Sequence, residues 1–254
     1  MVNPVIFEGP CIGCMDFQIK GVLKASTDPS FIFVENWINF RYVHNLAIFG
    51  GGQLDGQGQV AWPYNGCHKN PNCRLLSTSM RFDFITNGIV HDIKSINSKS
   101  GHFILFGCEN INMTKVKISA PSDSPNTDGI KISNSYGIRI RNVNIGTGDD
   151  CIAMISGTRK VRISRVTCGP GHGISVGSLG KDDGEEDVED IVVRNCTFYG
   201  TSDGLRIKTW AAPLSKPLKA SNLVYDDVVF YNVGNPIIID QQYCPHPPCM
   251  GQVS

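Results

Sequence analysis

Three features are missing from this sequence, and each absence excludes a class of protein. There is no run of about 20 apolar residues, so no helix is expected to cross a membrane. Basic and acidic residues number 23 each, so a general attraction to nucleic acid or to an anionic membrane is not expected. The i, i+3, i+4, i+7 spacing of apolar residues is not sustained anywhere, which argues against a helical fold.

The N-terminus also lacks a secretory leader. Residues 1–4 are followed by polar and strand-like residues rather than by a basic region and an apolar core. Yet the 10 cysteines are many for a cytosolic enzyme and indicate an oxidising compartment. Two glycosylation sequons, Asn112-Met113-Thr114 and Asn195-Cys196-Thr197, also fit a secreted protein. We therefore interpret the chain as a fragment of a longer secreted precursor, with a loss of export as the alternative.

What the sequence does contain is a repeat, together with 27 glycines and short β-branched runs that favour strands joined by turns. Its pattern is apolar, any, apolar, two residues, apolar, any, apolar, and clear copies occupy residues 111–118, 138–145, 161–168, 191–198 and 223–230. Their starts differ by 27, 23, 30 and 32 residues. The alternation predicts strands, and its slip at the centre predicts a bend between two short strands.

One such unit cannot bury its apolar face alone, but stacked copies build a continuous core. With this period, the economical architecture is a parallel β-helix with coils about 4.8 Å apart. The alternative is a β-propeller, which needs blades of about 40 to 45 residues with four antiparallel strands. The shorter period and the missing hairpin turns favour an all-β parallel β-helix, which we expect to form a single domain over residues 1–254.

Four polar clusters interrupt the repeat, at residues 126–129, 148–151, 171–173 and 206–208. Asp128 and Asp149 are 21 residues apart, and Asp149 and His172 are 23 apart, so each step is close to one coil. Residues one coil apart stack on the same face. The sequence therefore predicts a stripe of acids, followed by a histidine and then by the cations Arg206 and Lys208. Singly, each cluster has a structural alternative as a turn or ladder residue; their ordered combination favours a site.

Such a stripe suits the hydrolysis of a glycoside. One protonated carboxyl gives its proton to the leaving oxygen, and another activates water or attacks carbon. Repulsion among Asp128, Asp149 and Asp150 raises the pKa of at least one of them, which then holds a proton for donation. Arg206 and Lys208 alternate along a strand, so both can face one cleft and bind a sugar carboxylate.

At these clusters the chain resembles a known family. Asn126-Thr127-Asp128, Gly148-Asp149-Asp150, Gly171-His172-Gly173 and Arg206-Ile207-Lys208 match the four signature motifs of the polygalacturonases, glycoside hydrolase family 28. Residues 124–130, 168–175 and 239–244 are similar to the plant branch. The resemblance implies a right-handed parallel β-helix of the pectin-lyase-like type. It also implies inverting hydrolysis of the α-1,4 bonds of galacturonan in pectin, with no metal and no other cofactor.

The resemblance also implies a role for each catalytic residue. Asp149 corresponds to the general acid, and Asp128 and Asp150 to the pair that activates water. His172 would tune or share the proton of the acid, and Asn126 would orient its neighbours.

The remaining site residues follow from the same motifs. Arg206 and Lys208 would bind the substrate carboxylate, and Tyr243 corresponds to a substrate-contacting tyrosine. A disulfide between Cys151 and Cys168 is implied beside the catalytic turn. Outside the resemblance, Cys244 and Cys249 could close a small loop. The pair Cys11 and Cys14 has redox or zinc-like spacing, although disulfides are the better interpretation in a secreted repeat protein.

Three further features remain open to more than one interpretation. The acidic run in the insertion at 178–190 is expected to be a solvated loop, with calcium binding as the alternative despite the lack of EF-hand spacing. Trp210 follows Lys208 closely and could stack on a sugar. Trp62 is expected to be buried in a core or surface position instead.

Complete plant members of the family begin with a signal peptide and continue through further coils, so the resemblance implies a fragment that lacks both ends. We expect low stability or poor solubility from uncapped coils. The full protein is expected to be a monomer of the cell wall. Segments 9–11 and 20–25 are similar to the exo-acting branch. A pectate lyase and a non-catalytic pectin-binding homologue are the alternative functions.

Overall fold

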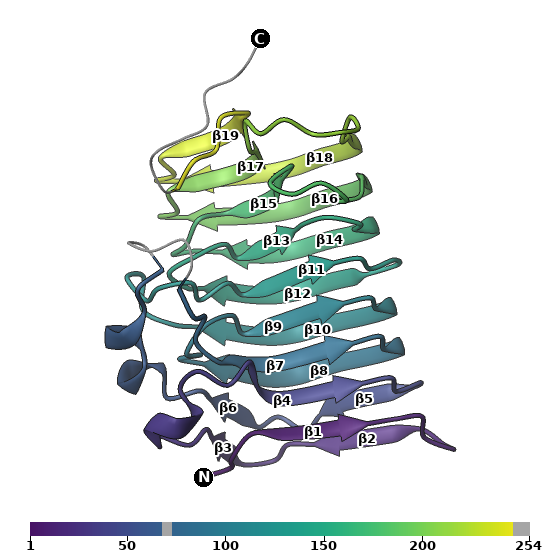
Figure 1. The fold of residues 1–254 in the computed structure, drawn as a ribbon, viewed down its shortest axis with the longest axis vertical. Helices are drawn as coiled ribbons and strands as arrows, with labels where there is room; N and C mark the ends of the chain where they lie inside the picture. Colours follow the sequence, from purple (N-terminus) through teal and green to yellow (C-terminus); the bar gives the residue numbers. More distant parts are fainter. Residues whose placement is uncertain (68–72, 246–254) are drawn as a thin grey trace.

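The computed structural model describes residues 1–67 and 73–245, which wind into a parallel β-helix (Figure 1). Two sheets form its walls, and each coil contributes one strand to each sheet. Every strand pair in the described part of the chain is parallel, which confirms the β-helix and excludes the antiparallel blades of a propeller.

We call one wall the short-strand sheet, because its strands have three to seven residues. In order it contains β1 (Val5–Glu8), β4 (Asn36–Arg41), β7 (Thr78–Asp83), β9 (Phe103–Phe106), β11 (Ile130–Ser133), β13 (Ile152–Met154), β15 (Ile174–Leu179), β17 (Asp203–Thr209) and β19 (Asn235–Asp240).

The opposite wall, the long-strand sheet, holds the five repeat copies. It contains β2 (Met15–Gln18), β5 (Leu46–Phe49), β8 (Thr86–Ile96), β10 (Glu109–Ser119), β12 (Arg139–Gly146), β14 (Arg159–Cys168), β16 (Val188–Tyr199) and β18 (Ala220–Tyr231). Two short strands, β3 (Val22–Lys24) and β6 (Gln53–Asp55), pair with each other, and β6 also pairs with β8.

The predicted bend occurs within single long strands, rather than between two short ones. Six neighbouring coils each place one residue of the long strand in the left-handed region, with φ between 50° and 53°. These residues are Asp92, Lys115, Asn142, Arg165, Asn195 and Asp227. One such residue turns the backbone and shifts the alternation by one position, so that apolar side chains before and after it both point inward. The inward residues of both walls form one hydrophobic core, in which Phe40, Ile140 and Phe198 are fully buried.

Within residues 1–67 and 73–245, helix is confined to three single turns, η1 (Pro29–Phe31), η2 (Gly58–Val60) and η3 (Trp62–Tyr64). In the described residues, no helix has the length and apolar character needed to cross a membrane. Both η2 and η3 belong to the long insertion before β7, which lies on the outside of the stack beside the short-strand sheet (Figure 1).

Candidate active site

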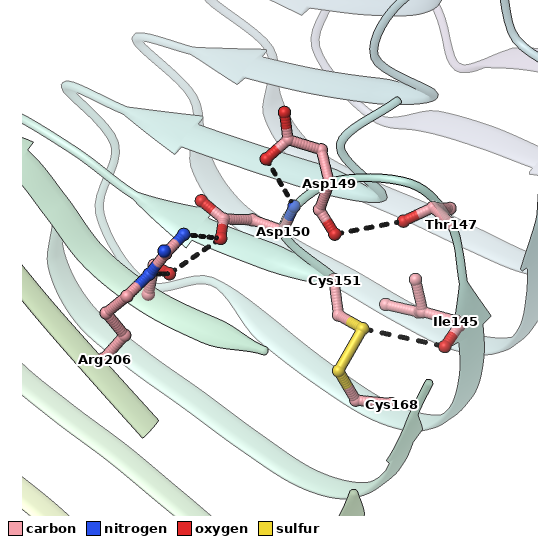
Figure 2. Close-up of a disulfide and its surroundings, with 8 residues drawn as sticks. Ile145, Thr147, Asp149, Asp150, Cys151, Cys168 and Arg206 are labelled. Carbon is pink, nitrogen blue, oxygen red and sulfur yellow. Dashed lines mark hydrogen bonds and ion pairs between the residues drawn. A yellow bond between two sulfur atoms is a disulfide. The ribbon is translucent and has the colours of Figure 1, made fainter. Parts of the chain in front are cut away.

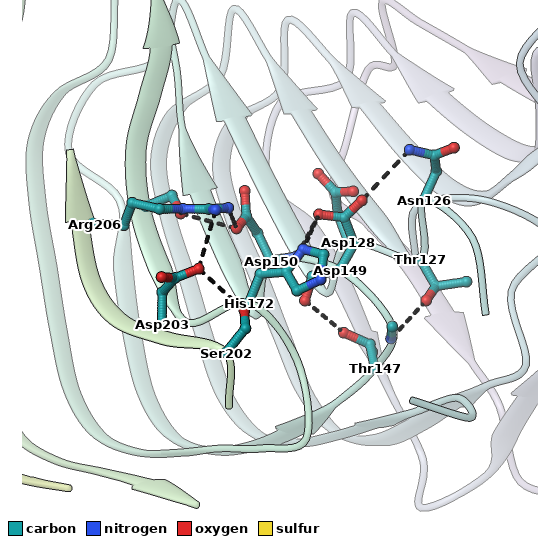
Figure 3. Close-up of polar contacts among 12 residues, drawn as sticks. Asn126, Thr127, Asp128, Thr147, Asp149, Asp150, His172, Ser202, Asp203 and Arg206 are labelled. Atoms are coloured by element: carbon teal, nitrogen blue, oxygen red, sulfur yellow. Dashed lines mark hydrogen bonds and ion pairs between the residues drawn. The ribbon is translucent and has the colours of Figure 1, made fainter. Parts of the chain in front are cut away.

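The predicted acidic residues lie in the turns that lead into the short-strand sheet. Asp128, Asp150 and His172 each lie two residues before a strand, β11, β13 and β15 respectively. Backbone hydrogen bonds join the levels: Gly129 N donates to Asp150 O at 2.9 Å, and His172 N donates to Asp149 O at 2.9 Å. The structure therefore brings the three acidic positions and the histidine together on successive coils (Figure 3).

Asp150 is held by both cations of the fourth cluster. Arg206 donates to its Oδ1 at 2.6 Å, Lys208 Nζ to its Oδ2 at 2.8 Å, and Ser175 Oγ to Oδ1 at 2.8 Å. The side chain of Asp150 is 3% exposed, that of Lys208 7% and that of Arg206 14%, so the pairs are protected from water. A carboxylate offers about four acceptor positions, and these three bonds leave one for a water molecule.

Asp149 makes a different set of contacts. His172 Nδ1 lies 3.3 Å from Asp149 Oδ1, and Asn126 Nδ2 donates to Oδ2 at 3.4 Å (Figure 3). Burial would raise the pKa of Asp149, but the hydrogen bond and charge of His172, with the Asp150 backbone N–H, lower it to about 2. The contact with Asp149 in turn raises the pKa of His172. In the free chain, the proton that the two groups share therefore resides on the imidazole.

Asp128 is the acid that retains a proton most readily. Burial raises its pKa to about 6; the nearby Lys131 opposes this rise, and the charges of Asp149 and Asp150 add to it. Lys131 Nζ lies 3.3 Å from Asp128 Oδ2. The expected repulsion among the aspartates is therefore present, and burial is the larger cause.

A cleft of about 460 Å³ opens over Asp149. Its lining contains Asn126, Asp149, His172, Arg206, Lys208 and Tyr243, so six of the eight predicted catalytic and substrate-binding residues face one space. Asp128 lines a neighbouring cavity, and Asn126 lies between the two. The ring of Tyr243 lies 5.1 Å from Lys208 Nζ.

The two tryptophans take different positions. Trp62 donates its indole N–H to Ser98 O at 3.1 Å and packs on a small cluster that includes Leu76, which is the expected structural role. Trp210 meets Tyr243 edge to face at 5.4 Å, so in this conformation it supports the tyrosine rather than lining the cleft.

Several contact residues were not singled out from the sequence. Asn65, in the insertion before β7, donates to Asn126 Oδ1 at 2.9 Å and so fixes the amide that reaches Asp149. Asp203 accepts from Arg206 at 3.2 Å, and Ser175 also accepts from Arg206 at 3.1 Å. Strand alternation could have identified Lys131, because it places this side chain on the outward face of β11 beside the Asp128 turn. Nothing in the sequence pattern marks Asn65.

The glycines of the motifs allow close packing of neighbouring coils. A Cβ at Gly148 would lie 2.0 Å from Ser124 O, and one at Gly173 would lie 2.2 Å from Gly204 O. Gly173 also has φ of +88°, which side chains rarely adopt. Both positions therefore need glycine because the neighbouring coil is too close for any side chain.

Disulfides lie beside the site on both sides. Cys151 and Cys168 are bonded, as the resemblance implied, and Cys151 directly follows Asp150 (Figure 2). A second bond joins Cys67 and Cys73, close to Asn65.

The expectation of disulfides at Cys11 and Cys14 is wrong, because both are free thiols. Cys108 and Cys196 are also free among the described residues. The expected partnership of Cys244 with Cys249 lies outside the described residues, because Cys249 falls in the range 246–254.

The acidic insertion is a self-capped loop. The Glu185 carboxylate accepts hydrogen bonds from three backbone N–H groups, those of Gly180, Lys181 and Asp182. Asp183 accepts from Ser215 N in the same way. These bonds give the acids a structural role in the loop, which fits the expectation of a solvated segment.

A metal ion has one geometric candidate in the described residues. Ligand atoms of Asp149, Asp150 and His172 lie within 4.8 Å of one another. Arg206 and Lys208 already compensate the charge of Asp150, however, and a bound cation would lie close to both of them. The donor set therefore fits an internal ion-pair network better than a cation site.

Comparison with known proteins identifies a matching family and similar proteins. The family described as "Glycosyl hydrolases family 28" matches residues 1–254. An exopolygalacturonase of Platanus acerifolia is 47% identical over 252 residues, which are 99% of this chain and 66% of that protein. A polygalacturonase of Gossypium barbadense is 45% identical over 249 residues, 98% of this chain and 61% of that protein. The chain thus spans about two thirds of the length of these curated relatives.

Solved structures give the same result for the fold. The polygalacturonase from Erwinia carotovora ssp. carotovora superimposes with a TM-score of 0.78 at 27% identity, covering 94% of this chain and 70% of that one. The exopolygalacturonase from Thermotoga maritima gives 0.77 at 20% identity, covering 95% and 67%. With the matched family and the two plant relatives, this shows that the chain belongs to glycosyl hydrolases family 28.

Proposed function

We propose that this protein hydrolyses the α-1,4 bonds between galacturonate residues of pectin, with inversion at the anomeric carbon. The observation that carries the proposal is the coil-by-coil stack of Asp128, Asp149 and Asp150 with His172. Arg206 and Lys208 complete the same cleft with positive charge. The polygalacturonases among its relatives support the substrate.

The contacts suggest how the protons move. Asp149 acts as the acid: the proton shared with His172 passes through it to the leaving oxygen as the glycosidic C–O bond breaks. On the opposite face of the sugar, a water oxygen forms the new C–O bond and gives its proton to Asp128 or Asp150. Asp150 has one acceptor position left for this water, and Asp128, with a pKa of about 6, takes up a proton readily.

Arg206 and Lys208 bind the substrate carboxylate in this proposal, although both also hold Asp150. Three of the five guanidinium N–H groups are engaged, with Ser175, Asp203 and Asp150. Lys208 uses one of its three donors on Asp150. Donors therefore remain for an incoming carboxylate, and Tyr243 lies beside them.

The remaining parts of the proposal concern the mode of cleavage and the place where the protein acts. We favour exo action, because relatives at 47% identity from Platanus acerifolia and Oenothera organensis are exopolygalacturonases.

We also propose an extracellular monomer that acts in the cell wall. The disulfides Cys67–Cys73 and Cys151–Cys168 fit such a compartment, and the sequon residue Asn195 is exposed on the long-strand sheet, away from the cleft. A lyase reaction is less favoured, because it would need a calcium ion on carboxylates that are already paired.

The test is release of reducing ends from polygalacturonate by the 254-residue chain. Asp149→Asn should lower kcat by roughly 10² to 10⁴-fold, since it removes the acid without changing the shape of the side chain. Asp226→Asn, at an exposed position on the long-strand sheet, is the matched control and should leave kcat unchanged. Monomer as the sole product would support exo action, and mixed oligomers would indicate endo action. An ultraviolet-absorbing unsaturated product, or equal rates for the two variants, would overturn the proposal.

A further inference from the structure

The acid of the proposed reaction has one neighbour whose contact is marginal. Asp149 Oδ2 accepts from Asn126 Nδ2 at 3.4 Å, close to the length at which a hydrogen bond is lost. The amide of Asn126 can also turn over, which would exchange its N–H group for its carbonyl oxygen at almost the same shape. Whether this bond forms therefore depends on what holds the amide in place.

A chain of hydrogen bonds determines the orientation of that amide. The backbone N–H of Cys67 donates to Asn65 Oδ1 at 2.9 Å, and Asn65 Nδ2 donates to Asn126 Oδ1 at 2.9 Å. A backbone N–H can only donate, and an ionised carboxylate can only accept. The chain therefore runs in one direction, from Cys67 to Asp149, and an amide that turned over would face a neighbouring group of its own kind.

The backbone around Asn65 is anchored to the β-helix. Asn65 directly follows η3, where its N–H donates to Trp62 O at 3.0 Å, and the Trp62 indole donates to Ser98 O at 3.1 Å. Cys67 is bonded to Cys73. Asn65 and Cys67 are 7% and 8% exposed, so water competes little for their hydrogen bonds. The start of the chain of hydrogen bonds is thus fixed before any substrate binds.

The bond from Asn126 matters most when the acid gives up its proton. As Asp149 donates to the leaving oxygen, negative charge develops on its carboxylate, and a donor at Oδ2 stabilises that charge. A carbonyl oxygen in the same place would repel the charge and would favour the protonated carboxyl instead. The direction of the chain of hydrogen bonds therefore affects the step in which the glycosidic bond breaks.

We propose that Asn65 is a positioning residue for the acid: anchored by Cys67, it holds the Asn126 amide with its N–H toward Asp149. The inference rests on the proposed function, in which Asp149 donates the proton. It gives the insertion before β7 a part in the chemistry, because Asn65 acts through Asn126 rather than on the sugar. Without Asn65, Asn126 Oδ1 loses its donor among the described residues, and the amide is free to turn over or to move away.

Two substrates with different leaving groups separate this role from a general loss of structure. Cleavage of polygalacturonate releases a sugar oxygen that needs a proton, whereas α-galacturonosyl fluoride releases fluoride, which needs little help from an acid. Asn65→Leu should lower kcat on polygalacturonate about tenfold, with KM and the rate on the fluoride both within about twofold of the parent. Asn65→Ala, which cannot crowd the cleft, should give the same split. Asn144→Leu, at an exposed asparagine of the long-strand sheet, is the matched control and should change neither rate.

A crystal structure of the Asn65→Leu variant gives a test that does not depend on activity. In it, no amide nitrogen of Asn126 should remain within about 3.5 Å of Asp149 Oδ2. An amide that keeps its place, or equal losses of rate on the two substrates, overturns the inference even where the parent cleaves polygalacturonate. Asn65 also lines the cleft, so a rise in KM with kcat unchanged would mean that it contacts the sugar, which overturns the inference as well. If the amide moves in the variant while the parent releases no reducing ends, the positioning role stands and the proposed activity falls.

Discussion

Each of the two walls of the β-helix contains an arginine–aspartate pair that joins different coils, and the two pairs have little else in common. On the long-strand sheet, Arg194 and Asp226 lie 3.3 Å apart with side chains 60% and 61% exposed. On the short-strand sheet, Arg206 and Asp150 lie 2.6 Å apart and are 14% and 3% exposed. An exposed pair contributes at most about 1 kcal/mol, whereas a buried pair is costly to form and still more costly to break.

This difference shows where the fold can hold chemistry. Along the long-strand sheet, outward side chains point into water, so substitutions there are expected to cost little stability. At the turns that lead into the short-strand sheet, the charged side chains of Asp150, Arg206 and Lys208 are largely buried, so they lose water and perturb one another. Burial raises the pKa of Asp128 to about 6, whereas the hydrogen bond and charge of His172 overcome burial and lower the pKa of Asp149 to about 2.

The largest expected effect on the free energy of unfolding comes from removing the aspartate of the buried pair, and the aspartate of the exposed pair is the comparison. Asp150→Ala leaves Lys208 buried without its ion-pair partner and leaves Arg206 with Asp203 alone, so it should lower the free energy of unfolding by about 3 to 5 kcal/mol. Asp226→Ala should change it by less than about 1 kcal/mol. Denaturant unfolding at pH 7 measures both. Equal losses for the two variants would remove the distinction between the two walls.

A smaller effect, of opposite sign, is expected at Asp128. Its pKa is raised in the folded chain, so its contribution to stability is fully present below the unfolded value and is lost as the pH rises through about 6. Asp128→Asn should therefore stabilise the fold by about 2 kcal/mol at pH 7 and by almost nothing near pH 4.

The matched control is Glu109→Gln, at an exposed carboxylate of the long-strand sheet, which should shift stability by less than about 0.5 kcal/mol at either pH. A gain for Asp128→Asn that is the same at pH 4 and pH 7 would count against buried charge as its cause.

The smallest expected effect concerns the bend of the long strands. Lys115 has φ of 51°, a conformation that asparagine adopts with less strain than lysine. Lys115→Asn should stabilise the chain by about 0.5 kcal/mol, while Lys117→Asn, two residues along the same strand, should be neutral or slightly destabilising. Thermal melting would distinguish them, and a loss at Lys115 would mean that its contact with Asp92 outweighs backbone strain.

Much of the fold was predictable, because the alternation of apolar and polar residues along a strand indicates which side chains point inward. The levels of Asp128, Asp149 and His172 followed from the same periodicity, since each step is close to one coil. The contacts of Asn65 could not be foreseen, because it lies in an insertion. The sequence repeat does not determine the backbone path of an insertion. The bonding of Arg206 and Lys208 to Asp150 was also beyond sequence reasoning, which gave the face of each side chain but not its partner.

The parallel register has a consequence for how such a chain can change over evolutionary time. Inside the core, Met113, Ile140, Ile163 and Val193 follow one another in a single column, each in register with the next. A larger side chain at one level meets the residue one coil above or below it, so compensating substitutions should occur at separations of one coil rather than between sequence neighbours. Drift in this chain would therefore be correlated along columns, and aligned relatives should show covariation between positions 113 and 140, 140 and 163, and 163 and 193.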